Sequence, residues 1–184
     1  MATQIVFLRG INLGSTNRIS MPELRELLAD VGFADVRTYL QSGNVVLSSR
    51  AAGATVARRC REAIADRFGL DIGVVARTRD ELADVVRRNP LGDIAKDPKR
   101  YQVSFLDVEP DAALVDKLAA VAAPRERFEV VGREVYAWHP AGVARSKLWS
   151  LLAGKGLGVT ATARNWTTVT QVLVLADGNT SRDR

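Results

Sequence analysis

The feature that most constrains the fold is an order of strand and helix patterns that occurs twice along the chain. Short apolar runs indicate strands, and apolar residues at every third or fourth position indicate helices. The first half has a strand at 3–8, a helix from Ser20 to Gly32, strands at 36–40 and 45–49, a helix at 55–68 and a strand at 72–76. This strand–helix–strand–strand–helix–strand order is that of the ferredoxin-like plan.

The second half repeats this order without repeating the residues. It has a strand at 101–106, a helix at 110–121, strands at 127–131 and 134–138, a helix at 146–152 and a strand at 158–163. Residues 165–175 then favour a terminal helix capped near Asn165 or Thr167, although 172–175 are equally typical of a strand. We therefore predict an α+β protein of two ferredoxin-like (βαββαβ, α-β plait) subdomains with a linking helix and a C-terminal helix.

Cap and turn residues support these boundaries. Ser20 and Glu23 form a capping box at a helix start, with Pro22 in the first turn. Gly43 lies between two strands where a hairpin turn requires a positive φ, and Gly132-Arg133 is a tight hairpin signal. The strands on either side of each turn are therefore expected to pair antiparallel.

A charged segment separates the two halves. A capping box at 78–81 opens a helix through Arg88, and residues 91–100 form a charged linker that contains Pro98. We expect an N-terminal ferredoxin-like subdomain at 1–77, a linking helix and charged linker at 78–100, and a C-terminal ferredoxin-like subdomain with the terminal helix at 101–184.

Composition excludes several classes of protein. The 184 residues are 47% hydrophobic and 26% charged, as in an ordinary globular protein. No apolar run approaches the roughly 20 residues that span a bilayer, and the N-terminus lacks the pattern of a signal peptide. The lone cysteine, Cys60, cannot form an internal disulfide, which indicates a reducing compartment and hence a cytoplasmic protein.

The same composition limits the chemistry. The chain has one histidine and one cysteine, so structural zinc is excluded and a histidine-based catalytic zinc site is disfavoured. We expect His139 to be a surface or capping histidine and Cys60 to be an inert thiol on an apolar helix stripe. A Ser-His-Asp triad would have to use His139, and no Gly-x-Ser-x-Gly elbow supports one. No metal and no cofactor are expected, and whether the protein is an enzyme stays open.

Two nucleotide-related motifs are weak. Residues 10–16 follow a strand and precede a helix, as phosphate-binding loops do, but they lack the lysine of such loops. We favour a structured loop without a ligand there. RNA recognition by base stacking is also disfavoured, because residues 43–48 offer no aromatic platform.

The net charge of +5 comes mostly from arginine, whose planar fork of donors suits phosphate and carboxylate groups. Two polar clusters concentrate such residues at strand ends. The first cluster is Arg9, Asn12, Asn17, Gln41, Ser42 and Asn44, which meet if the first and third strands are antiparallel neighbours. The second cluster is Arg145, Ser146, Lys147, Arg164, Asn165 and Trp166. Turn chemistry and helix capping are the structural alternatives for these residues.

Six short segments form a recognisable pattern: residues 8–14, 21–24, 32–33 and 38–45 near the N-terminus and 145–148 and 161–169 near the C-terminus. In these segments the chain resembles a bacterial family, the "domain of unknown function 1697" family. The resemblance covers about residues 3–175. It implies two α–β plait subdomains and implies no activity.

Three hypotheses for function follow. The one we favour is a non-enzymatic binding module that takes an anionic ligand (a nucleotide, nucleic acid or phosphorylated metabolite) at the two clusters. An alternative is a small-molecule enzyme acting on a phosphorylated or carboxylated substrate, positioned by Arg9 or Arg164. A second alternative is a protein-interaction domain with Trp149 or Trp166 exposed at an interface. We expect no membrane partner, and the oligomeric state stays open.

Overall fold

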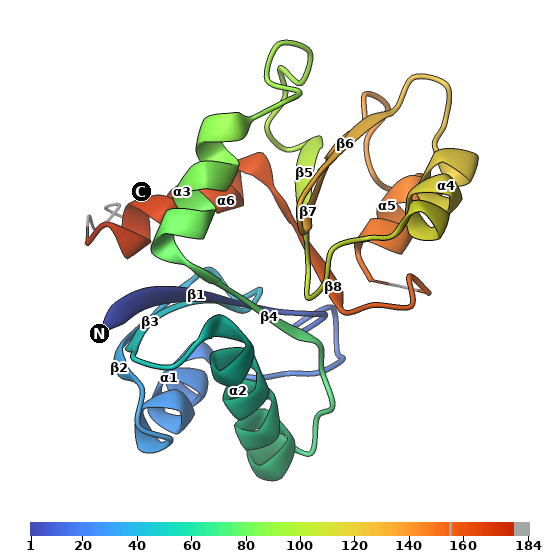
Figure 1. The fold of residues 1–184 in the computed structure, drawn as a ribbon. Coiled ribbons are helices and arrows are strands. Elements are labelled where there is room, and N and C mark those ends of the chain that lie inside the picture. The colour runs from blue at the N-terminus through green and yellow to red at the C-terminus, as the bar shows by residue number, and fades with distance from the viewer. Residues whose placement is uncertain (155, 179–184) are drawn as a thin grey trace. The chain divides into compact units, whose positions relative to one another are not determined.

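The structure is a computed structural model that describes residues 1–154 and 156–178. The chain divides into two compact units (Figure 1). The first unit contains Met1–Asp84 and the residues from Gln171 onward, and the second contains Val85–Thr170. The division that the sequence predicts, into subdomains at 1–77 and 101–184 joined by a linking segment at 78–100, stays a prediction.

The first unit is built on a four-stranded antiparallel sheet. Its elements are β1 (Ala2–Leu8), α1 (Met21–Asp30), β2 (Ala34–Tyr39), β3 (Asn44–Ser49), α2 (Gly53–Phe68) and β4 (Val74–Thr78), followed by the start of α3 (Arg79–Arg88). The strand order is β2-β3-β1-β4. Helices α1 and α2 lie against one face of this sheet (Figure 1). They bury Leu24, Leu28, Val56, Cys60 and Ile64 against β1 and β3.

The local signals of the first half form as the sequence predicts. Ser20 is the N-cap of α1: its Oγ accepts from the Glu23 N–H (3.3 Å) and donates to the Glu23 carboxylate (2.5 Å). Gly43 has a φ of +75°, and a Cβ there would lie 2.6 Å from the Leu8 Cβ. Only glycine fits this turn without a shift of the β1 end, because both the backbone conformation and the space exclude a side chain.

The second unit repeats the topology. Its elements are β5 (Tyr101–Leu106), α4 (Ala112–Val121), β6 (Arg127–Val131), β7 (Glu134–Trp138), α5 (Lys147–Leu152), β8 (Ala161–Asn165) and the start of α6 (Trp166–Ala176). The strand order is β6-β7-β5-β8, again all antiparallel. Leu114, Leu118, Leu148 and Leu152 from α4 and α5 pack with Leu106, Val135 and Ala137 of the sheet. Within the described residues the protein is therefore a mixed α+β fold with two four-stranded antiparallel sheets and six helices.

Two strands are shifted relative to the sequence prediction. The last strand was predicted at 158–163 and lies at Ala161–Asn165, because β5 pairs with it from Gln102↔Asn165 to Leu106↔Ala161. Gly156 and Gly158, with φ of +76° and +88°, place the preceding segment in turns. The fourth strand was predicted at 72–76 and lies at Val74–Thr78, because β1 pairs with it as far as Gln4↔Thr78.

The open choice at the C-terminal end is resolved in favour of the helix. Residues 172–175 lie within α6 and are not a strand. The Asn165 Oδ1 accepts from the Thr168 N–H (2.8 Å), so Asn165 is the predicted cap. None of the helices in the described ranges combines the length and apolar character that a bilayer crossing requires.

Candidate functional site

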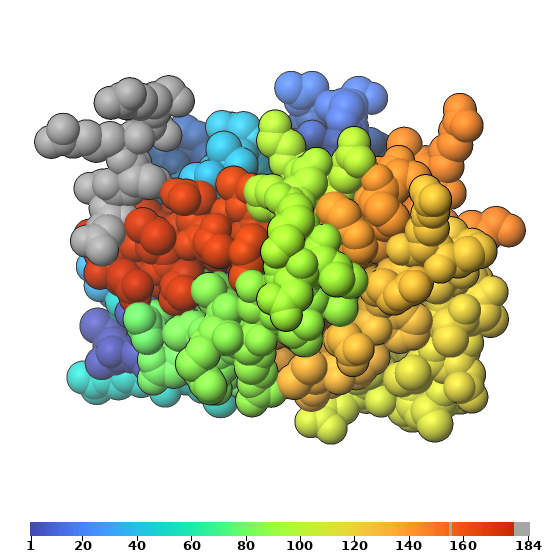
Figure 2. Space-filling view, turned by 90° about the horizontal axis from the view of Figure 1, so that it is seen from above, coloured from blue at the N-terminus to red at the C-terminus, as the bar shows by residue number. Residues whose placement is uncertain are grey.

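Two loops of the second unit enclose a pocket of about 380 Å³. One loop joins α4 to β6, and the other joins β7 to α5. The lining residues are Ala123, Arg125, Glu126, Pro140, Ala141, Gly142, Ala144, Arg145 and Ser146. Figure 2 shows the yellow and orange segments around residues 120–150 as one continuous part of the surface of this unit. The volume lies in the range of small-molecule sites, roughly 300–1,000 Å³. We call this cavity the Arg125–Arg145 pocket.

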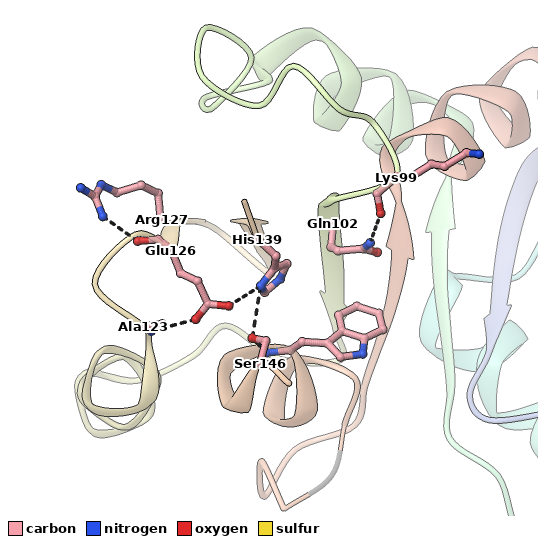
Figure 3. Close-up of polar contacts among 8 residues, drawn as sticks. Lys99, Gln102, Ala123, Glu126, Arg127, His139 and Ser146 are labelled. Carbon is pink, nitrogen blue, oxygen red and sulfur yellow. Dashed lines mark hydrogen bonds and ion pairs between the residues drawn. The ribbon is translucent and has the colours of Figure 1, made fainter. Parts of the chain in front are cut away.

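A buried histidine lies behind the pocket wall. His139 follows the last residue of β7 and is 0% exposed, so the prediction of a surface or capping histidine is wrong. Its Nδ1 lies 2.7 Å from the Glu126 Oε1 and 3.2 Å from the Ser146 Oγ. Figure 3 shows both side chains directed at this one ring nitrogen. Trp149 packs against the imidazole in a T-shaped contact with ring centroids 6.1 Å apart.

The hairpin β6–β7 explains why Glu126 and His139 meet. Arg127 and Trp138 are the last paired residues at the open end of this hairpin. Glu126 and His139 are the next residue on each strand, so the register places them opposite each other. The Gly132-Arg133 turn predicted from the sequence sets this register. Counting outward from that turn along both strands pairs Glu126 with His139, and this count is the sequence signal for the site.

Glu126 is held in its ionised form. Its Oε2 accepts from the Ala123 N–H (2.8 Å), in addition to the contact with His139. Burial acts to raise the pKa of the Glu126 carboxyl, but hydrogen bonds from Ser146, the Ala123 N–H and His139 outweigh burial and lower the pKa. An ionised carboxylate can only accept, so the imidazole Nδ1 carries a proton and donates it to Glu126. The buried Nε2 has no hydrogen-bond partner within the described residues.

This geometry differs from that of a nucleophilic triad. In a triad the histidine contacts the serine through one ring nitrogen and the acid through the other. Here Ser146 and Glu126 approach the same nitrogen. The Ser146 Oγ also accepts from the Trp149 N–H (2.9 Å) as the N-cap of α5. The three side chains thus fix the two loops to each other, and this arrangement does not favour nucleophilic catalysis.

Two arginines give the pocket its positive charge. Arg125 and Arg145 line it from opposite loops, and both are exposed. In the part of the chain that the structure describes, neither has a hydrogen-bond or ion-pair partner for its guanidinium group. Lys147, the first residue of α5, is exposed next to them in the sequence. The structure therefore brings the predicted site residues Arg145 and Ser146 to this pocket. It adds Arg125 and Glu126, which were not predicted as site residues, and it places His139 buried behind them.

The other three members of the second cluster have separate neighbours. Arg164 is buried in β8, where it donates to the Thr162 Oγ1 (2.7 Å) and the Ala163 carbonyl oxygen (2.9 Å), and burial lowers its pKa to about 10. Asn165 caps α6. Trp166 stacks on Tyr101 with ring centroids 4.8 Å apart. These residues stabilise the strand-to-helix junction and do not line the pocket.

The first cluster comes together at one end of the first sheet, as the strand pairing predicts. Asn12 Nδ2 donates to the Gln41 carbonyl oxygen (2.7 Å) and to the Ile19 carbonyl oxygen (2.8 Å). Asn17 Nδ2 donates to the Gly10 carbonyl oxygen (3.1 Å). Asn44, which pairs with Phe7, donates from Nδ2 to the Tyr39 carbonyl oxygen and the Ser42 Oγ, both at 3.0 Å. The backbone N–H of Arg9 donates to the Gly73 carbonyl oxygen (2.8 Å).

The hydrogen bonds of these amides stabilise the loops that contain them. Asn12 and Asn17 have positive φ values of 53° and 48°, which asparagine tolerates better than most residues. A shallow pocket of about 550 Å³ lies beside them, lined by Asn12, Gly14, Arg18, Ile19, Ser20, Glu23 and Gln41. Its arginine donates to the Gly14 carbonyl oxygen (3.3 Å), and its glutamate contributes an opposite charge. The turn-chemistry alternative therefore accounts for the Asn12, Asn17 and Asn44 amides.

Three further side chains bear on the sequence expectations. Cys60 is buried, and burial raises the pKa of its thiol to about 12, as expected of an inert cysteine. Trp149 and Trp166, one or the other of which the protein-interaction alternative requires to be exposed, are both half-buried. Within residues 1–154 and 156–178, no group of three or more His, Cys, Asp or Glu side chains is placed to hold a metal ion.

Comparison with known proteins gives a family and a fold. The model of a family described as a protein of unknown function (DUF1697) matches residues 1–136. No curated protein matches the chain. A solved structure of a conserved bacterial protein from Streptococcus pneumoniae is similar, with a TM-score of 0.77 and 17% identity over 95% of this chain and 98% of that chain. At that identity the likeness shows the fold alone. Glu126 lies inside the matched segment and His139 lies beyond it. The family resemblance in the sequence is thus confirmed over residues 1–136, and the chain belongs to the DUF1697 family of proteins of unknown function.

Proposed function

We propose that the protein is a binding module for a small anionic ligand and that the ligand binds in the Arg125–Arg145 pocket. The observation that carries this proposal is the state of the charged groups that line the pocket. Its two guanidinium groups have no protein partner among the described residues, whereas its carboxylate, Glu126, already accepts from three donors. The pocket thus offers guanidinium donors that no described residue uses, and its two cations outnumber its one carboxylate.

Arginine is well suited to this role. Its planar guanidinium group binds carboxylate and phosphate oxygens through paired N–H donors. Arg125 and Arg145 come from two different loops, and the Ser146–His139–Glu126 contacts connect those loops. The two cations are therefore attached to one fixed frame, which reduces the entropy lost when a ligand binds between them.

The size of the pocket selects among the anionic ligands that the sequence suggested. A cavity of about 380 Å³ suits a small phosphorylated or carboxylated metabolite. A nucleic-acid strand would instead require a longer basic groove with stacking aromatic residues. We propose the metabolite.

Three further predictions from the sequence remain part of this proposal: the ferredoxin-like arrangement of each unit, the linking segment and the cytoplasmic location. We propose that each unit has the ferredoxin-like arrangement, since both sheets have the strand order in which the first and third strands are central. We also retain 78–100 as the linking segment between subdomains 1–77 and 101–184. A single buried cysteine suits a reducing compartment, which supports a cytoplasmic location.

Calorimetry on the full chain tests the proposal. The probes are inorganic phosphate, glycerol 3-phosphate, citrate, AMP and a short single-stranded oligonucleotide, each at low and moderate salt. We expect salt-sensitive binding of at least one small anion. Arg145→Ala and Arg125→Ala should each weaken it about tenfold, since a hydrogen bond to a charged group contributes about 1.5 kcal/mol.

Arg50→Ala is the matched control. Arg50 is an exposed loop arginine of the first unit without a hydrogen-bond or ion-pair partner in the described ranges, and its loss should leave the affinity unchanged. The proposal is wrong if none of the probes binds, or if binding persists at full strength in the Arg125→Ala/Arg145→Ala double variant.

A further inference from the structure

The walls of the Arg125–Arg145 pocket differ in character from its charged groups. Five of the nine lining residues are small and carry no side-chain polar group: Ala123, Pro140, Ala141, Gly142 and Ala144. They come from both loops, as the two arginines do. An anion that consisted only of charged oxygens would leave this apolar surface in contact with water, whereas a ligand with a hydrocarbon part would cover it.

The buried carboxylate restricts the ligand further. Glu126 is ionised and lies in the pocket wall, so each additional negative charge on a ligand is repelled at short range. Two arginines against one glutamate leave a net charge of about +1 among the lining side chains. A singly charged acid matches this balance, and a nucleoside triphosphate does not.

Glu126 also disfavours ligands that carry an amine. A carboxylate has about four lone-pair sites. Ala123 N–H, His139 Nδ1 and Ser146 all donate to Glu126. The attraction of Glu126 for an ammonium group is offset by the hydration that this group loses in the pocket, because few acceptor sites are left for its N–H donors. We therefore expect a zwitterionic amino acid to bind more weakly than the corresponding acid without the amine.

We infer that the ligand of this pocket is a free, compact organic acid with a single anionic group and an apolar body, such as an aryl or branched-chain carboxylate. This inference rests on the proposed function, because it assigns the class of ligand to the same site. In the bound state the carboxylate lies between Arg125 and Arg145, and the hydrocarbon part lies against the loop alanines and Pro140.

A ligand series separates the contributions of charge and apolar surface. The probes are acetate, butyrate, 3-phenylpropionate, phenylalanine, octanoate, inorganic phosphate and ATP, measured by calorimetry with the full chain. Affinity should rise from acetate to 3-phenylpropionate, by up to about fourfold for each methylene that becomes fully buried. Phenylalanine should bind at least tenfold more weakly than 3-phenylpropionate, and ATP more weakly than either.

Octanoate distinguishes a compact ligand from a lipid chain. A compact site should bind octanoate no more tightly than 3-phenylpropionate, because the end of the longer chain extends beyond the walls. A steep increase with chain length would overturn the compact-acid assignment in favour of a fatty acid.

Variants connect the series to the pocket. Ala141→Asn places a polar group on the apolar wall and should weaken the binding of 3-phenylpropionate severalfold more than it weakens the binding of acetate. Arg145→Ala should lower the affinity for both acids about tenfold, and the control Arg50→Ala should change neither affinity. Circular dichroism of each variant verifies that the fold is retained.

The outcomes distinguish this inference from the proposed function. If phosphate or ATP binds through Arg125 and Arg145 and the affinity of the acids does not rise with the apolar body, the compact-acid assignment is wrong and the anion-binding function stands. If no probe, including phosphate, binds in an arginine-dependent way, both are wrong.

Discussion

The same position in the two sheets is occupied in two different ways. In the first unit the residue immediately before β2 is Phe33, which is buried in the core. In the second unit the residue immediately before β6 is Glu126, which is 8% exposed and contacts His139. The two strands have the same place in the two sheet orders, so the positions are topologically equivalent.

The neighbouring arginines differ in the same way. Arg59 lies over the Phe33 ring, 4.6 Å from the centroid, and its guanidinium group also donates to the Val31 carbonyl oxygen. Arg125 and Arg145 beside Glu126 have no protein partner within the described residues. The same topology thus has two kinds of end. At the end of the first unit, which we call the closed end, the Arg59 guanidinium group packs on the Phe33 ring. At the end of the second unit, which we call the open end, Glu126 and His139 form a buried polar pair and two arginines line a pocket. The side chains at this position, and not the topology, therefore decide whether a pocket forms.

The largest expected effect tests whether the closed end is part of the core. Phe33→Ala should lower the free energy of unfolding by about 3–5 kcal/mol, because it removes a buried aromatic ring and leaves a cavity. Urea unfolding followed by circular dichroism measures this. Phe33→Leu is the control and should cost about 1.5 kcal/mol or less, since it retains most of the apolar volume. A loss below about 1 kcal/mol for Phe33→Ala would show that the two ends are less different than their burial indicates.

The order of elements could be predicted from the sequence because its signals are local. Apolar periodicity, the capping box of Ser20 and the turn at Gly43 each depend on a few neighbouring residues. The limits of β4 and β8 could not be predicted in this way, because each is set by pairing with a central strand that is far away in the sequence.

The candidate site was predicted only in part for the same reason. Arg145 and Ser146 stood out as a local cationic and capping motif. The partner of His139 is 13 residues away across a hairpin, and its complete burial depends on Trp149 and the loop before α5. Arg164 was expected at a site and is buried in β8, because this strand ends at Asn165, two residues further along the chain than the sequence pattern indicates.

The next effect in size concerns the polar pair at the open end. Glu126→Gln should lower the free energy of unfolding by about 1–3 kcal/mol at neutral pH, because the buried donors of His139, Ser146 and Ala123 lose an ionised acceptor. The matched control is Glu129→Gln, which changes an exposed glutamate of β6 and should alter stability by less than about 0.5 kcal/mol.

This effect should depend on pH with a defined sign. The pKa of Glu126 in the folded protein lies below its ordinary value of 4.5, so the unfolded chain takes up the proton first as the pH falls. The stabilisation is therefore fully present above about pH 4.5 and is lost as the pH falls through the folded pKa. Unfolding free energies measured from neutral pH downward should show wild type and Glu126→Gln converging below that value. A difference that stays constant across the range would mean that the carboxylate is not held in its ionised form.

The smallest effect compares the arginines of the two ends. Arg59→Ala should lower the free energy of unfolding by about 1 kcal/mol, because the half-buried guanidinium group loses both the Phe33 ring and the Val31 carbonyl oxygen. Arg145→Ala should change it by less than about 0.5 kcal/mol, since this exposed side chain contributes no ion pair or hydrogen bond within the described residues. Thermal and urea unfolding of both variants in one buffer provide the measurement. A cost for Arg145→Ala equal to that for Arg59→Ala would mean that its guanidinium group is bound by the protein itself, and it would then be unavailable to a ligand.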